Sequence, residues 1–211
     1  LWTRSSKHRS MADFQLSRLA LIACWLLVVQ LAAVRADFFF PKVIYFGEEL
    51  APNQTKALSV AASSTGDVYI AGETFGNLRG NINAGSSDAF VLKYNSSGVI
   101  EFTRLLGTIN TESALSIAVL SNTSAFFITG YFPTSNVDLV PHAYLAKFSN
   151  NGTLLWLMKH ALNDSTGFGL ALSPLGEAAY VVGTLSGNGN ARGAVSAIIT
   201  KWDTVTGDQI W

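Results

Sequence analysis

A strand-like segment recurs three times in this chain at a fixed spacing. Its first copy, residues 88–98, alternates apolar and polar residues and then enters a polar turn that ends in glycine. The copies at 142–152 and 196–207 follow the same pattern. One lysine occupies the same place in every copy, at intervals of 54 residues: Lys93, Lys147 and Lys201. A fixed period of this size is typical of repeat proteins, in which each repeat is one supersecondary unit.

Three further segments recur around this one. The first is a strand of small residues, found at 57–61, 114–118 and 167–171. The second is a more aromatic strand ending in glycine, found at 68–72, 126–130 and 179–183. The third begins after the turn glycine, and an aromatic residue four positions beyond that glycine sets its register: Phe102, Trp156 and Trp211. Small side chains recurring in a strand predict that another backbone approaches it closely.

Four short strands per unit, joined by polar turns and without helical periodicity, predict an all-β fold of four-stranded antiparallel sheets. Such sheets bury their apolar faces by stacking, and units of this length set radially make a β-propeller, in which each sheet is called a blade. The expected blades are residues 53–107, 108–160 and 161–211, within a propeller region of 37–211. A lone strand at 43–47 is expected to close the ring by pairing with the last blade. Because the fourth strand is cut short at Trp211, we expect a truncated chain with about three blades.

The run Gly-Asp-Val-Tyr-Ile-Ala-Gly at 66–72, followed by the segment 88–98, resembles the SBBP family of β-propeller repeats. The resemblance extends over residues 43–211 and implies a ring of about six to eight blades. Where the family has an aspartate, at Asp88 of the first unit, the second unit has His142 and the third has Ser196.

The N-terminal region predicts a secretory signal peptide at residues 11–36. Arg18 supplies its positive end, residues 19–31 form its apolar segment, and cleavage is expected after Ala36. Residues 1–10 are an unassigned upstream segment. The alternative is an uncleaved membrane anchor, although the apolar run is shorter than the roughly 20 residues that a spanning helix needs. A bacterial lipoprotein signal at Cys24 is disfavoured because the apolar run continues beyond this cysteine.

Composition narrows the classes of function. The chain has 14 basic and 14 acidic residues, so a nucleic-acid partner, which usually meets a basic face, is not expected. Cys24 is the only cysteine. The rest of the chain therefore has no disulfide, no thiolate zinc site and no cysteine nucleophile.

No pattern in the sequence predicts a catalytic, metal or cofactor site. The repeated lysines are interpreted as structural, with packed stems and solvated ammonium groups. Adjacent Glu48 and Glu49 would point to opposite faces of a strand and are assigned to a solvated turn. The remaining acidic and histidine candidates are dispersed, and the glycine-rich stretch 183–190 lacks the lysine of a phosphate-binding loop. These dispersed candidates are Asp88, Asp138, Asp164, Asp203, His142 and His160.

Five Asn-x-Ser/Thr sequons fall in expected turns or loops and predict a glycoprotein if the chain is secreted by a eukaryote. The candidate N-glycosylation sites are Asn53, Asn95, Asn122, Asn151 and Asn163.

These observations lead to the hypothesis of a secreted, non-catalytic binding module. Its partners would be proteins or glycans, bound by the variable loops 73–87, 131–141 and 184–195 on one propeller face. One alternative is a propeller enzyme, a hydrolase or lyase whose site at the central channel needs residues from further blades. The other is a structural surface protein made of many such repeats. A membrane would be a partner only if the N-terminal segment stays uncleaved.

Overall fold

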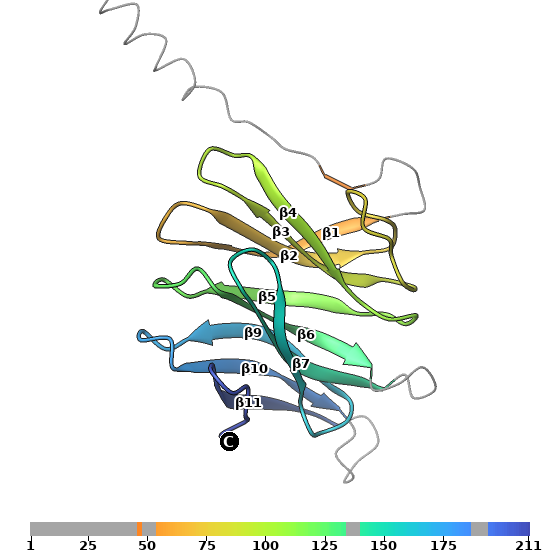
Figure 1. The fold of residues 1–211 in the computed structure, drawn as a ribbon. Coiled ribbons are helices and arrows are strands. Elements are labelled where there is room, and N and C mark those ends of the chain that lie inside the picture. The colour runs from red at the N-terminus through yellow and green to blue at the C-terminus, as the bar shows by residue number, and fades with distance from the viewer. Residues whose placement is uncertain (1–45, 48–53, 134–139, 187–193) are drawn as a thin grey trace, which may run out of the picture. The chain divides into compact units, whose positions relative to one another are not determined.

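The computed structural model describes residues 46–47, 54–133, 140–186 and 194–211. These residues form eleven strands in three antiparallel sheets, and no helix occurs among them (Figure 1). The first sheet contains β1 (Thr55–Ala62), β2 (Val68–Thr74), β3 (Asp88–Tyr94) and β4 (Ile100–Leu106). The second contains β5 (Ser113–Val119), β6 (Phe126–Pro133), β7 (Pro141–Phe148) and β8 (Leu154–Lys159). The third contains β9 (Ser165–Leu172), β10 (Ala178–Ser186) and β11 (Val195–Asp203). The predicted all-β class with repeated antiparallel units is confirmed.

The third sheet also has the beginning of a fourth strand. Lys201 accepts a backbone hydrogen bond from Ile210 at 2.7 Å and donates one to Trp211 at 2.8 Å. The same pairing occurs in the complete sheets, where Lys93 lies opposite Phe102 and Lys147 lies opposite Trp156. The register predicted from the spacing between turn glycine and aromatic residue is therefore confirmed.

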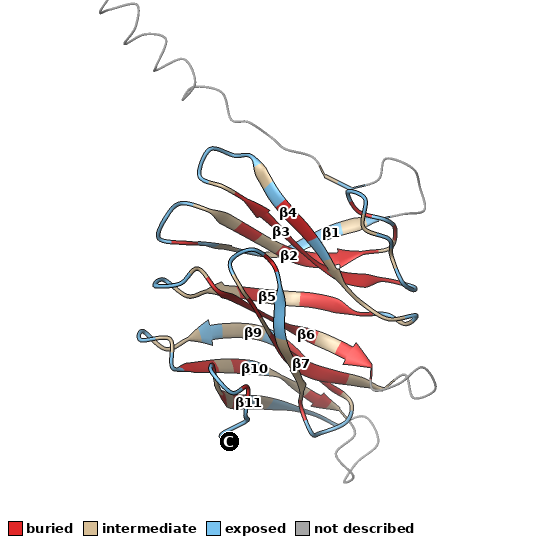
Figure 2. Ribbon diagram, viewed as in Figure 1, coloured by how far each residue is buried: buried red, intermediate tan, exposed pale blue. Residues whose placement is uncertain are grey.

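The sheets pack face to face, and their strands contain many buried residues (Figure 2). Apolar side chains fill the space between the sheets. Between the first and second sheets, the ring of Phe126 stacks parallel to that of Phe148 at 5.0 Å and packs against Tyr69 at the same distance. Between the second and third sheets, Phe127 and Leu145 meet buried Trp202. A sheet that is apolar on both faces cannot exclude water from both by itself, so stacking supplies the burial that stabilises it.

The small-residue strands lie next to one another in successive sheets. β5 contacts β1, and β9 contacts β5. The approach is close enough for the Ile117 amide to donate a hydrogen bond to the Ser59 hydroxyl at 3.2 Å. A Cβ at Gly167 would lie only 2.3 Å from the Thr129 hydroxyl oxygen. The close approach predicted from small side chains is therefore confirmed.

Each of these first strands carries a β-bulge at the same repeat position. The extra residue is Leu58, Leu115 or Phe168. Beside each bulge, a recurring glycine of the second strand faces a backbone carbonyl so closely that a Cβ would lie 1.9–2.0 Å from its oxygen. These glycines are Gly72, Gly130 and Gly183. They were predicted to end their strands, but β2, β6 and β10 continue for two or three residues beyond them. The recurring glycine is thus required by the bulge opposite it.

Several N-terminal predictions lie outside the described residues. These include the signal peptide 11–36, its cleavage after Ala36, and residues 43–45 of the lone strand. Of that strand, Phe46 and Gly47 are described, and the Phe46 ring packs edge-on against Phe90 of the first sheet at 5.8 Å. Phe46 and Leu78 together pack on the first sheet's face that points away from the second sheet.

Candidate binding site at the loop end

The connections between strands gather at two opposite ends of the sheets (Figure 1). Short turns occupy one end, called here the turn end: residues 63–67, 95–99, 120–125, 149–153, 173–177 and 204–208. The other end, called the loop end, has the long connection 75–87 and the shorter connections 107–112 and 160–164. The segregation follows from antiparallel order, since each strand returns to the end at which its predecessor began.

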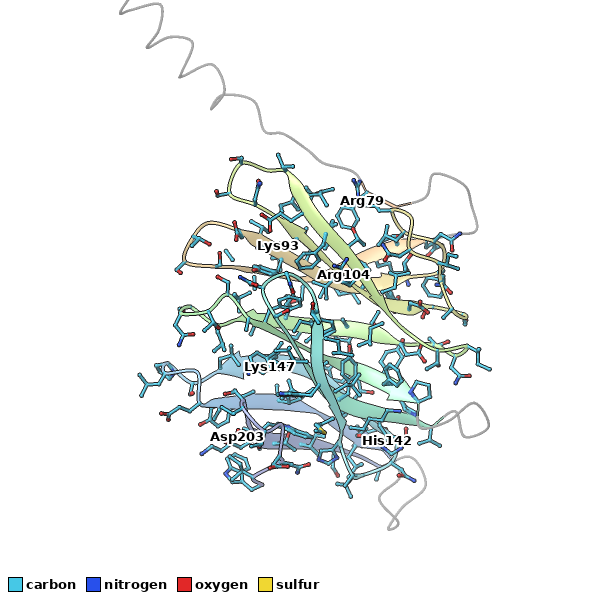
Figure 3. The ribbon with its side chains drawn as sticks, viewed as in Figure 1. Arg79, Lys93, Arg104, His142, Lys147 and Asp203 are labelled. Carbon is cyan, nitrogen blue, oxygen red and sulfur yellow. The ribbon has the colours of Figure 1, made fainter. Side chains whose placement is uncertain are left out.

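At the turn end, the repeated lysines join one sheet to the next. Lys147 donates a hydrogen bond to the Thr204 carbonyl at 2.8 Å, and Lys93 reaches the carbonyl of Asn150 at 3.5 Å. Both acceptors lie 57 residues after their lysine, in the turn of the following sheet. Figure 3 labels Lys93 and Lys147. The predicted structural role is therefore supported for Lys93 and Lys147, but the prediction of a solvated ammonium group is wrong for Lys93, which is 6% exposed. The close approach of the next sheet's turn supplies acceptors that replace water.

An aromatic residue and a turn glycine form a second repeated contact at this end. A Cβ on Gly152 would lie 2.9 Å from the Phe102 ring, and one on Gly207 would lie 3.2 Å from the Trp156 ring. Both glycines have positive φ angles, 80° and 79°. The glycine therefore permits the turn conformation and also leaves room for the ring of the preceding sheet.

The residue that opens each of these turns caps it. Asn95 Oδ1 accepts hydrogen bonds from the amides of Ser97 and Val99 at 3.1 and 2.9 Å. In the third sheet, Asp203 Oδ1 accepts two from the amides of Val205 and Thr206, at 2.7 and 2.8 Å, and these bonds lower the pKa of Asp203. Asp203 thus has a local structural role.

The loop end contains a tightly held junction between the first and second sheets. The Asn110 carbonyl accepts hydrogen bonds from the amides of Ser86 and Ser87 at 2.9 and 3.2 Å. The Glu112 amide donates to the Ser87 carbonyl at 2.8 Å, and the Glu112 carboxylate accepts from the Thr108 amide at 2.9 Å. The connection 107–112 is therefore fixed against the end of the loop 75–87.

Two buried carboxyl groups lie beneath this junction. Asp88 is 1% exposed and Glu112 is fully buried. Burial raises the pKa of Asp88, against the effect of a hydrogen bond from the Ala84 amide at 3.0 Å. Burial also raises the pKa of Glu112; the hydrogen bonds from Thr108 oppose this shift and the neighbouring Asp88 adds to it. The Asp88 carboxylate packs so closely on Gly107 that a Cβ there would lie 2.2 Å from Oδ1.

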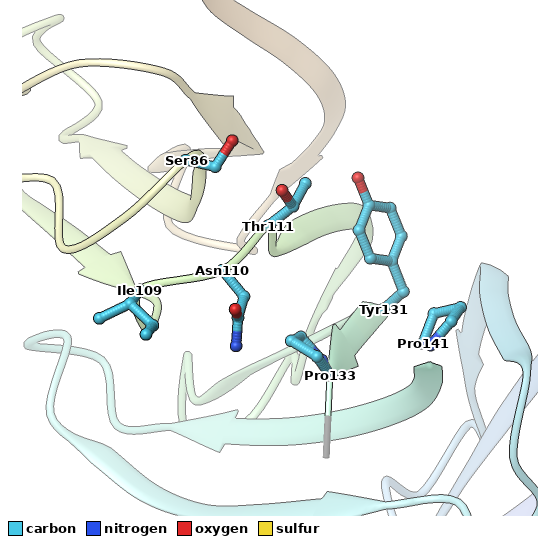
Figure 4. Close-up of a pocket in the computed structure, with 7 residues that line it drawn as sticks. All are labelled: Ser86, Ile109, Asn110, Thr111, Tyr131, Pro133 and Pro141. Carbon is cyan, nitrogen blue, oxygen red and sulfur yellow. The ribbon is translucent and has the colours of Figure 1, made fainter. Parts of the chain in front are cut away.

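A cavity of about 460 Å³ opens above the junction (Figure 4). It has an apolar side formed by one tyrosine, two prolines and an isoleucine, and it has three hydrogen-bonding side chains. Its lining residues are Ser86, Ile109, Asn110, Thr111, Tyr131, Pro133 and Pro141. Volumes of about 300–1,000 Å³ are usual for small-molecule sites.

Tyr131 stands between this cavity and an acidic interior. Burial raises the pKa of Tyr131, and the nearby carboxylates of Glu73 and Glu112 raise it further. Glu73 is itself paired with Lys56, whose ammonium nitrogen lies 2.8 Å from the carboxylate oxygen. The phenol therefore stays protonated at neutral pH and can donate a hydrogen bond.

Two of the three variable segments predicted to bind ligands contribute to the cavity. Ser86 belongs to the segment 73–87, and Tyr131, Pro133 and Pro141 belong to 131–141. From the third segment, 184–195, residues 187–193 lie outside the described residues. The sequence analysis missed the connection 107–112, which supplies Ile109, Asn110 and Thr111. Its constant place between the fourth strand of one unit and the first strand of the next could have identified it.

The structure brings the two candidate histidines into direct contact. His142 lies in β7 rather than in a loop, is buried, and donates from Nδ1 to the His160 carbonyl at 3.0 Å. His160 is also buried, and burial lowers its pKa. Among the described residues, no group of three His, Cys, Asp or Glu side chains is placed to hold a metal ion. Glu48, Glu49 and Asp138 lie outside the described residues, as does 187–190 of the glycine-rich stretch.

The sequons are divided between the two ends. Asn95, Asn122 and Asn151 lie in turns at the turn end, and Asn163 lies in the connection 160–164 at the loop end. Asn53 is outside the described residues. Their glycosylation remains a prediction.

Comparison with protein-family models gave no match, and a search of curated proteins found no relative of this chain. The described residues include no helix that is long and apolar enough to cross a bilayer.

Proposed function

We propose that the chain is part of a secreted β-propeller of the SBBP repeat type and serves as a non-catalytic binding module for a protein or glycan. The observation that carries the proposal is the convergence of two variable segments, 73–87 and 131–141, on one cavity at the loop end. Variable loops presented by a rigid scaffold are a common place for binding residues.

The repeated sheet-to-sheet contacts support the propeller part of the proposal. Val91 and Leu145 are buried at equivalent positions on faces covered by the next sheet. The equivalent residue of the third sheet, Ile199, is 56% exposed. Lys201 and Trp211 repeat the lysine and aromatic positions of the two interfaces. The outward face of the third sheet therefore has apolar, lysine and aromatic residues at the positions that hold the first sheet to the second and the second to the third. This is expected if a further sheet packs on that face.

The binding role is tested on glycan and protein arrays with the full chain and with a double variant at the cavity, Thr111→Ala and Tyr131→Ala. Loss of the bound signals in this variant is the expected result. A matched variant at the turn end, Leu175→Ala and Val205→Ala, alters two exposed side chains and should bind as the unchanged chain does. The proposal fails if no array ligand is retained, or if the cavity variant retains every ligand.

The secreted state is tested by expression in eukaryotic cells with a C-terminal tag. The medium should contain a product that begins at Asp37 and whose apparent molecular mass decreases after enzymatic removal of N-glycans. Retention of the whole product in the cell membrane would favour the uncleaved anchor instead.

A further inference from the structure

The cavity at the loop end has a lining that is specific enough to indicate the chemistry of its ligand. The seven described residues that line it all have uncharged side chains. Tyr131, Pro133 and Pro141 provide an aromatic and aliphatic side, while Ser86, Asn110 and Thr111 provide hydroxyl and amide groups (Figure 4). A ligand that matches this lining has an apolar face and several neutral hydrogen-bonding groups around its edge.

The surroundings of the cavity disfavour an anionic ligand. Glu73, Asp88 and Glu112 lie buried behind the lining. The lysines in this region are already engaged, Lys56 with Glu73 at 2.8 Å and Lys159 with the Pro133 carbonyl at 2.6 Å. Neither lysine is among the residues that line the cavity. None of the described residues that line the cavity is a cation, so a phosphate, sulfate or sialic acid group would find no opposite charge among them.

The backbone that carries Asn110 is held in place before any ligand arrives. Asn110 is fixed through its carbonyl, which accepts two amide hydrogen bonds, and its own amide is 3.2 Å from the Thr108 hydroxyl. Thr108 is held in turn by the buried Glu112 carboxylate. A preformed site loses less conformational entropy on binding than a mobile one.

Two kinds of neutral ligand use aromatic surfaces of this sort. Proline-rich peptides dock into grooves lined by several aromatic rings, which receive successive turns of the extended chain. The lining of this cavity has one aromatic ring, Tyr131, facing three hydrogen-bonding side chains. One aromatic ring combined with three hydrogen-bonding side chains suits a pyranose ring. The C–H face of the sugar can pack on the phenol while its hydroxyl groups bind the hydrogen-bonding side chains.

We infer that this cavity binds a neutral saccharide of one or two sugar rings, with Tyr131 as the stacking residue and Asn110 and Thr111 as hydrogen-bonding residues. The inference rests on the binding role proposed above and narrows its ligand class. The described lining offers a charged glycan no opposite charge, and hydrogen bonds hold the backbone of the connection 107–112 that carries Asn110 and Thr111.

The test is a titration of the full chain, followed by NMR or calorimetry, with cellobiose, lactose and N,N′-diacetylchitobiose as neutral probes. Sialyllactose, a heparin disaccharide and a proline-rich decapeptide are the comparison probes. At least one neutral disaccharide should bind, and each charged probe should bind at least about tenfold more weakly, a difference of about 1.4 kcal/mol.

Variants separate stacking from general damage to the fold. Tyr131→Ala should weaken binding of the neutral probe about tenfold or more, whereas Tyr131→Phe, which keeps the ring, should stay within about threefold. Thr111→Val alters an exposed residue and should weaken binding without changing the unfolding transition. Ile82→Ala removes an exposed apolar side chain that does not line the cavity and is the matched control.

The inference is overturned if no neutral saccharide binds, or if Tyr131→Ala and Thr111→Val both bind it as the unchanged chain does. Binding of the decapeptide or a charged glycan that is lost in the cavity variants would overturn the saccharide assignment and leave the proposed binding role standing. If no ligand is retained on the arrays, both the saccharide inference and the proposed binding role are contradicted.

Discussion

Lys93 is a charged residue whose surroundings explain why a lysine recurs at its position. Its ammonium nitrogen lies 2.7 Å from Glu101 and 3.1 Å from Asp67, and it sits 5.2 Å from the centre of the Tyr69 ring. Burial disfavours the charge on Lys93, but the hydrogen bonds to Glu101 and Asp67 outweigh this effect and raise its pKa. The Lys93 ammonium group therefore contacts β4, the turn 63–67 and the next sheet at the same time.

Replacement of Lys93 by methionine is expected to lower the free energy of unfolding by about 1–3 kcal/mol, since Asp67 would lose its charged partner. Lys201→Met, at the equivalent place on the outward face of the third sheet, should change it by less than about 0.5 kcal/mol. Urea unfolding of both variants measures the difference. Equal effects of the two substitutions would contradict a stabilising role for the contacts that Lys93 makes with Asp67, Glu101 and Asn150.

Asp88 provides a residue-scale prediction about pH. Burial raises its pKa in the folded chain above the unfolded value, so the folded state holds its proton more tightly. Its contribution to stability is therefore fully present below the unfolded pKa and is lost as pH rises through the folded pKa. Asp88→Asn removes this titration while keeping an oxygen that can accept from Ala84.

The difference in unfolding free energy between Asp88→Asn and the unchanged chain should therefore shift in favour of the variant between pH 4 and pH 7. Measuring the difference, rather than the stability of one chain, cancels the opposite titration of His160, whose pKa is lowered by burial. Urea unfolding at several pH values provides the measurement. A difference that stays constant with pH would show that Asp88 titrates as it does in the unfolded chain.

At the scale of the strand, the bulge and its opposing glycine act as a pair. A methyl group at residue 72 would lie 1.9 Å from the Lys56 carbonyl oxygen, and backbone atoms cannot move aside easily. We expect Gly72→Ala to destabilise the chain by about 3 kcal/mol, an overpacking cost. Gly169→Ala is the matched control, because its methyl would meet the methyl of half-exposed Val182, which can rotate away. Thermal unfolding that shows the same loss for both variants would contradict the bulge as the cause.

The strands themselves were predictable because their signals are local and repeat. Alternation and turn glycines indicate a strand and its end, and the spacing to Phe102 and Trp156 indicates the register. The bulge at Leu58 was not predictable, since its two flanking residues read as an ordinary strand and only pairing with β2 reveals the extra residue. The recurring Gly72 was visible in the sequence, but its cause is a carbonyl on another strand.

At the scale of the whole chain, the candidate site was predictable only in part. Sequence variability among the repeats indicated the segments that carry Ser86 and Tyr131. The order of the strands places the connection 107–112 at the same end, but variability could not indicate that Asn110 and Thr111 lie between these segments, because that proximity depends on how one sheet stacks on the next. The lysine contact with Asn150 was hidden for the same reason.

Stacking also leads to a prediction about the outward face of the third sheet. Val182, Ile199 and Trp211 are 45%, 56% and 54% exposed on this face. Large exposed apolar surfaces of this kind promote association in water. The 211-residue chain without its first 36 residues is therefore expected to self-associate at micromolar concentration, through contacts that substitute for a further sheet.

Ile199→Lys should shift this chain toward the monomer, because a charge would be placed at the centre of the apolar surface, where Leu145 of the second sheet is fully buried. Val205→Lys adds the same charge at an exposed turn residue and is the control for solubility. Light scattering across a concentration series measures the association. If both variants reduce self-association equally, net charge rather than the loss of the apolar outward face explains the effect. If the unchanged chain is already monomeric, the outward face does not associate with copies of itself.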